Sequence, residues 1–186
     1  MKRPHDALRL DVQAFITEGE TLAGQWPGAG LSRLAELQTP PQDAGLADVE
    51  WRAQGQRLPV AGGEAELWLA LQAGARIWLT CQRCLQPLAE PLAVDRRIRF
   101  VRGEAAAEAL DAEIEDDVLA LSKALDLREL VEDELLLALP IVPRHGVCPQ
   151  PLPLPVDDAP APEDVPEKPH PFAALQRLKT PSGDGG

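Results

Sequence analysis

The feature that most restricts the fold of this chain is that hydrophobic residues recur at every second position in segments between residues 46 and 102. In this region apolar residues alternate with polar ones, as is typical of strands with one buried face. Gly62-Gly63 and Ala73-Gly74 interrupt the alternation as turn signals. Strands are expected at residues 21–26, 49–53, 65–71, 76–80 and 92–101. Short connections between the last four predict an antiparallel sheet or an open barrel.

Helices are expected before and after these strands. Asp11 stands where it would cap a short helix that ends at Gly19, and leucines recur at helical spacing in residues 31–37. Asp126 begins a longer amphipathic helix that Pro140 ends. This helix is also acidic, yet packing of its apolar stripe on a sheet face is favoured over partner recognition. The predicted fold class is therefore α+β, an antiparallel sheet or open barrel flanked by helices.

Proline and acidic residues set the C-terminal part of the chain apart. Nine prolines fall between residues 149 and 171, a composition that cannot form a packed core. We therefore expect a core domain over 1–148, a Pro-rich acidic tether over 149–170, and a short amphipathic C-terminal helix and tail over 171–186. The apolar face of this helix would dock on the core domain or on a partner, and consists of Phe172, Leu175 and Leu178.

Charge is divided unevenly along the chain. Residues 1–103 carry 12 basic and 12 acidic side chains, whereas residues 104–186 carry 6 and 18, which accounts for the whole net charge of −12. Direct RNA contact is therefore permitted in the first part and disfavoured in the second. An odd number of cysteines indicates a reducing cytoplasm rather than a disulfide framework. Since no apolar run suits a signal peptide or a membrane span, no membrane partner is expected.

Three cysteines and one histidine have a spacing that suits a metal ion. Cys81 and Cys84 form a C-x-x-C pair, in which two thiolates can bind one tetrahedral zinc ion. His145 and Cys148 would supply the two further ligands. The alternatives are a metal-free relic of such a site and a redox pair. Redox chemistry of the thioredoxin type, however, needs the pair at a helix N-terminus, and this pair follows a strand.

Arginines are concentrated in the last expected strand. Four or five arginines on one sheet face would give a salt-sensitive contact with RNA, because guanidinium groups suit phosphate geometry. The alternative is a solvated face on which they pair with Asp95, Glu64 or Glu66. The candidate RNA-binding residues are Arg76, Arg83, Arg96, Arg97, Arg99 and Arg102.

The sequence offers little support for a catalytic function. It contains no nucleophile elbow and no phosphate-binding loop. The acidic residues at 113–117 are interpreted as a solvated run that precedes a helix. We therefore expect a protein that is not an enzyme and has no small-molecule substrate.

Three segments, in this order, resemble one family. They are CQRCL at 81–85, the stretch 126–143 with its VEDELLLALP block, and PFAALQRLK at 171–179. Together they are similar to the YceD family, the large ribosomal RNA subunit accumulation proteins of bacteria. Many members carry additional cysteines in a G-L-C-P-x-C-like segment. This chain departs from that pattern, since Cys148-Pro149 is followed by Gln150-Pro151.

The resemblance implies a cytoplasmic, non-catalytic ribosome-biogenesis factor that supports synthesis, processing or accumulation of 23S ribosomal RNA. The partners it implies are this RNA or its precursor, in direct or indirect contact, and ribosome-assembly or RNA-processing proteins. Two alternatives stay open: a protein–protein adaptor that never contacts RNA, and a small structural zinc domain.

Overall fold

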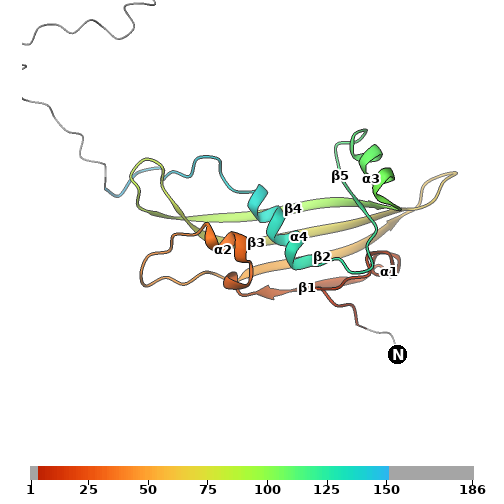
Figure 1. Cartoon of the computed structure of the whole chain (residues 1–186), viewed down its shortest axis with the longest axis horizontal. Coiled ribbons are helices and arrows are strands. Elements are labelled where there is room, and N and C mark those ends of the chain that lie inside the picture. The colour runs from red at the N-terminus through yellow and green to blue at the C-terminus, as the bar shows by residue number, and fades with distance from the viewer. Residues whose placement is uncertain (1–3, 151–186) are drawn as a thin grey trace, which may run out of the picture. The chain divides into compact units, whose positions relative to one another are not determined.

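The computed structural model describes residues 4–150, which form one five-stranded sheet with helices (Figure 1). The strands are β1 (Thr21–Trp26), β2 (Val49–Leu58), β3 (Glu66–Thr80), β4 (Pro87–Val101) and β5 (Asp117–Ala120). The helices are α1 (Val12–Glu18), the 3-10 turn η1 (Gly28–Gly30), α2 (Ser32–Glu36), α3 (Glu104–Asp111) and α4 (Leu127–Leu137). The sheet order is β1-β2-β3-β4-β5; β1 to β4 are antiparallel, and β5 joins β4 in parallel. The predicted α+β fold is confirmed, as an open sheet.

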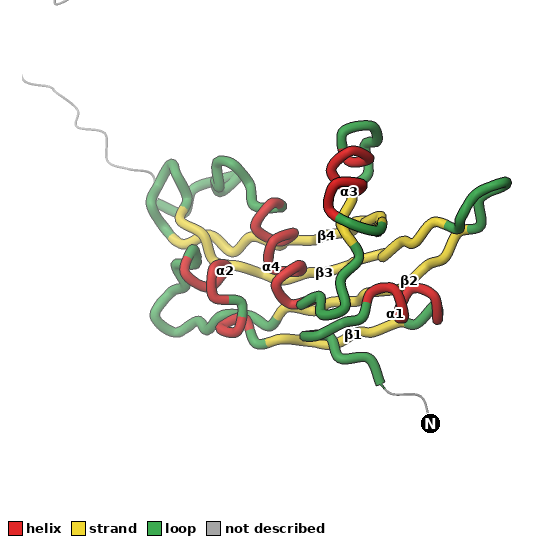
Figure 2. Tube along the Cα trace, turned by 45° about the vertical axis from the view of Figure 1, so that its right-hand side comes forward, coloured by secondary structure: helices red, strands yellow, loops and turns green. Residues whose placement is uncertain are grey.

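Helices α1, α2 and α4 lie on one side of the sheet (Figures 1 and 2). α1 packs on β2 and β3, and α4 packs on β3, β4 and α2. Because side chains alternate along a strand, only one face of the sheet supplies the core, through residues such as Leu71 and Ile98. Phe15 of α1 and Leu135 of α4, both fully buried, pack against that face. We call the opposite side of the sheet the open face.

Helix α1 begins and ends as the sequence predicts. The Asp11 side chain accepts a hydrogen bond from the Ala14 N–H at 3.0 Å, and Gly19 ends the helix with a φ of 65°. The helix lies very close to β2. A Cβ atom on Gly55 would come within 2.6 Å of the Ile16 Cα atom, so this strand position requires glycine.

The expected turn at Ala73-Gly74 is wrong, because β3 continues through it. Gly74 pairs with Glu50 of β2 and with Ala93 of β4. Small residues favour strands only weakly, but here pairing with a neighbour on each side holds the extended backbone. Two expected strands are therefore one, and the turn that follows this long strand carries Cys81.

The interpretation of the acidic residues at 113–117 as a solvated run is confirmed, because Glu113, Glu115, Asp116 and Asp117 are all exposed. The element that follows them directly, however, is a short strand that was not expected. Residues 104–120 form α3 and β5, and Asp117 begins β5. Val118, only 7% exposed, is the one fully buried residue of β5, and its N–H donates to the Asp111 carboxylate at 3.2 Å. A strand with a single buried residue shows no period in the sequence.

Two acidic side chains of α4 are buried. Glu132 accepts hydrogen bonds from the Leu34 N–H at 3.0 Å and from the Arg33 guanidinium at 3.0 and 3.2 Å, which joins α4 to the first turn of α2. Glu134 forms an ion pair with Arg96 of β4 at 3.4 Å. These two acids therefore serve the packing of α4, in line with the favoured interpretation.

No helix within residues 4–150 is long and apolar enough to cross a bilayer. From residue 151 onward, the predicted tether and C-terminal helix lie outside the described residues, together with Phe172, Leu175 and Leu178. The predicted domain boundaries and this docking face stay predictions.

Candidate metal centre and arginine face

The C-x-x-C pair lies in the tight turn that joins β3 to β4. The Cys81 N–H donates to the Gln86 carbonyl at 3.0 Å, and the Leu85 N–H donates to the Cys81 carbonyl at 2.9 Å. Leu85 adopts a φ of 59°, a conformation uncommon for a non-glycine residue. Both cysteine residues are buried, with 0% of Cys81 and 3% of Cys84 exposed. The turn thus directs two thiols inward.

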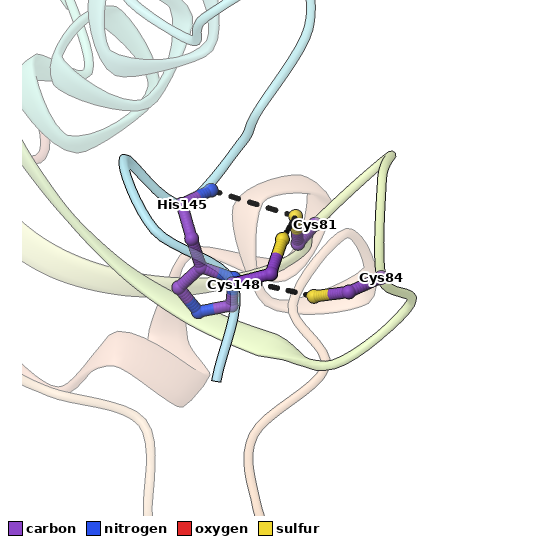
Figure 3. A group of neighbouring side chains, drawn as sticks. All are labelled: Cys81, Cys84, His145 and Cys148. Carbon is purple, nitrogen blue, oxygen red and sulfur yellow. Dashed lines mark hydrogen bonds between the residues drawn. The ribbon is translucent and has the colours of Figure 1, made fainter. Parts of the chain in front are cut away.

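The segment after α4 brings the other two candidate ligands to this turn. The Gln82 N–H donates to the Pro143 carbonyl at 2.9 Å, which fixes the two loops against each other. Figure 3 shows the four side chains converging from these two loops. Their ligand atoms all lie within 4.8 Å of one another. We call these four residues the cysteine–histidine cluster, and they are Cys81, Cys84, His145 and Cys148.

The donor atoms of the cluster fit a zinc ion. The Sγ atoms of Cys81 and Cys148 lie 3.9 Å apart, and the Cys84 Sγ lies 3.4 Å from His145 Nδ1. A tetrahedron with zinc–sulfur bonds of about 2.3 Å has edges of about 3.8 Å. Three sulfurs and one imidazole nitrogen form a set that structural zinc sites use, with all four positions taken by protein.

The cluster also favours a thiolate at one position. Burial raises the pKa of Cys81, but N–H groups of His145, Arg83 and Cys84 more than offset it, and the pKa falls to about 5. Burial is the main reason that the pKa of Cys84 is raised. Metal binding would displace the proton from Cys84, since thiolates are the ligands of zinc.

Arg83, one of the predicted RNA-binding residues, lies against the cluster. Its Nε donates to Cys148 Sγ at 3.0 Å, and this contact is the main cause that raises the Arg83 pKa. Its Nη2 lies 3.2 Å from the His145 carbonyl and 3.4 Å from that of Gly146. This role could not be predicted from local sequence, because these partners lie some sixty residues further along the chain.

Two of the predicted arginines stack on a tryptophan on the open face. The Arg97 guanidinium lies 4.4 Å from the centre of the Trp68 ring, and that of Arg99 lies 5.9 Å from it. Arg99 also forms an ion pair with Glu66 at 3.0 Å. Arg76 lies on the same face, because it is an even number of residues from Trp68 on β3.

The expectation that four or five of these arginines share one face is not met. Arg96 alternates with Arg97 along β4 and so points to the helix side, where it contacts Glu134. Arg102 follows the end of β4 and lines a cavity of about 630 Å³ together with Arg57. The basic residue that sequence reasoning missed is Arg52, whose register partner on β3 is Gln72, on the open face.

The fold and the cysteine–histidine cluster together define a small α+β protein in which two loops meet at a candidate metal-binding site. A family model described as "Large ribosomal RNA subunit accumulation protein YceD" matches residues 69–179. A Haemophilus influenzae protein of the same description is 30% identical over 161 residues, which cover 84% of this chain and 86% of that protein. No solved structure matches the chain. The chain belongs to the YceD family, so the predicted resemblance is confirmed.

Proposed function

We propose that this protein is a cytoplasmic, non-catalytic factor of ribosome biogenesis that supports the accumulation of 23S ribosomal RNA. Membership of the YceD family carries the proposal, because the family and the Haemophilus influenzae relative are both named for accumulation of the large ribosomal RNA subunit. That name describes an RNA level and not a chemical reaction. It therefore supports a binding role rather than catalysis.

The proposed RNA contact is the open face of the sheet. Arg52, Arg76 and Arg97 are all exposed there, from three neighbouring strands. The Arg97 guanidinium lies over the Trp68 ring, and this contact limits the side-chain freedom lost on binding phosphate. Glu66 and Asp95 share this face, so the contact would be modest and salt-sensitive. The secondary candidates for RNA contact are Arg83, Arg96 and Arg102. Of these, Arg83 and Arg96 already have partners within the fold.

Crosslinking in cells tests this contact. The tagged protein should enrich 23S RNA or its precursor, and the double substitution Arg76→Glu with Arg97→Glu should abolish the enrichment. Arg128→Glu on α4 is a matched control with the same charge reversal per site, away from the open face. Co-purified ribosomal or RNA-processing proteins without RNA crosslinks would instead support an adaptor, and would move the search to Phe172, Leu175 and Leu178.

A structural zinc ion in the cysteine–histidine cluster is a second proposal. The observation that favours it is the convergence of four donor atoms within 4.8 Å. The ion would hold together two loops that share only a few hydrogen bonds. Metal analysis of protein purified without chelator should find close to one equivalent of zinc, and less than about a tenth of an equivalent would exclude a structural site.

A further inference from the structure

The Arg83 side chain crosses from one loop of the cysteine–histidine cluster to the other. Arg83 stands between the two cysteines of the β3–β4 turn, yet its guanidinium has all three hydrogen-bond partners in the second loop. These are Cys148 Sγ at 3.0 Å, the His145 carbonyl at 3.2 Å and the Gly146 carbonyl at 3.4 Å. A single side chain thus contacts a ligand atom and the backbone that carries the ligands.

The charge of the cluster requires a partner of this kind. Three thiolates and a neutral imidazole around a divalent ion leave a net charge of about −1. A negative charge on buried sulfurs is costly unless a cation or hydrogen-bond donors compensate it. Among residues 4–150, Arg83 is the one cationic side chain with a hydrogen bond to a cluster residue. Arg83 and Arg144 are both exposed, but Arg144, which is adjacent in sequence to His145, makes no such bond.

We propose that Arg83 is a positioning residue of the metal centre. It balances the charge of the cluster and fixes the backbone at 145–146 so that His145 and Cys148 face Cys81 and Cys84. The proposal rests on the proposed zinc site. The planar guanidinium fork matters as well as its charge, because a lysine ammonium is a point charge on a flexible stem and is a poor match for three separate acceptors.

Zinc affinity, measured by competition of the full-length protein with a chromophoric chelator, tests this role. Arg83→Gln should weaken zinc binding about 10- to 100-fold, the usual effect of losing a group that supports metal ligands. The zinc affinity of Arg83→Lys should fall between those of Arg83→Gln and the wild type. The control Arg144→Gln removes the same charge beside the cluster. Its zinc affinity should stay within about twofold of wild type, because Arg144 makes no hydrogen bond to the cluster and its charge is screened by solvent.

A second measurement separates loss of ligands from loss of support. With cobalt in place of zinc, the absorption bands of tetrahedral thiolate coordination should appear in wild type and in Arg83→Gln alike, at a higher metal concentration in the variant. A wild-type protein that binds no zinc would overturn both the zinc site and this role. If the wild type binds zinc and Arg83→Gln binds it equally well, the role of Arg83 alone is refuted. Wild-type affinity in Arg83→Lys would refute the requirement for the fork.

Discussion

Substitution of Glu132 by alanine should destabilise the protein strongly, although Glu132 lies within the acidic stretch of α4. Glu132 is 7% exposed, and its carboxylate accepts one hydrogen bond from the Leu34 N–H at 3.0 Å and two from Arg33. With alanine, the Leu34 N–H loses its partner at a buried position. The unmet N–H should lower the free energy of unfolding by about 1–3 kcal/mol. Arg33 should add little, because its side chain is 47% exposed and water can replace the carboxylate.

The chain offers a matched control for this prediction. Asp133 is next along the helix and also contacts Arg33, but it is 48% exposed. Urea unfolding, followed by the fluorescence of the four tryptophans, reports on the sheet, where all of them lie. Glu132→Ala should unfold at clearly lower urea than Asp133→Ala at constant metal content. Equal midpoints for the two variants would refute the role of Glu132 in joining α2 to α4.

Three further predictions concern packing, pH and metal. Gly55→Ala should lower the free energy of unfolding by about 1–3 kcal/mol in the same urea assay, because its new Cβ would overpack against α1. Gly74→Ala should have a much smaller effect, since the nearest atom to its new Cβ lies at 3.5 Å. Burial and then the charge of Asp117 raise the pKa of Glu134, against the opposing effect of Arg96. The folded state therefore binds the proton of the Glu134 carboxyl more tightly than the unfolded state does. The stability that this protonation contributes at low pH is lost as pH rises from the ordinary carboxyl pKa through the raised one. Accordingly, the stability of Glu134→Gln relative to wild type should increase with pH across that window, and a pH-independent difference would contradict the sign. Chelator should make the loop at 143–148 accessible to protease. The sheet should still unfold cooperatively in urea, because the hydrophobic core cluster does not include the cysteines. Loss of the whole unfolding transition would show that the sheet itself depends on metal.

The sequence predicts this fold wherever a signal repeats along several residues. The alternation of β2 and β4 and the capped helix α1 are such cases. Helix α1 forms where it is expected, whereas both strands are longer than expected, since β2 continues to Leu58 and β4 begins at Pro87. The failures fall where local composition and pairing disagree. Gly74 indicates a turn in isolation, but Glu50 and Ala93 pair with it from both sides. β5 contributes a single fully buried residue, Val118, so no pattern could show it.

The candidate site divides in the same way. Four potential ligands could be chosen from their spacing and chemistry alone, and the structure brings all four together. The partners of Arg83 could not be chosen, since they depend on how the loop at 143–148 folds back onto the β3–β4 turn. The separation of Arg96 from Arg97 follows from the pleat of β4, and strict alternation predicts it once the strand is known.

The level of 23S relative to 16S ribosomal RNA in cells depleted of this protein is the most direct test of its proposed role. The account predicts a lower ratio on depletion, which the wild-type gene restores and the Arg76→Glu and Arg97→Glu double variant restores poorly despite normal folding. An unchanged ratio after complete depletion would contradict the proposed function.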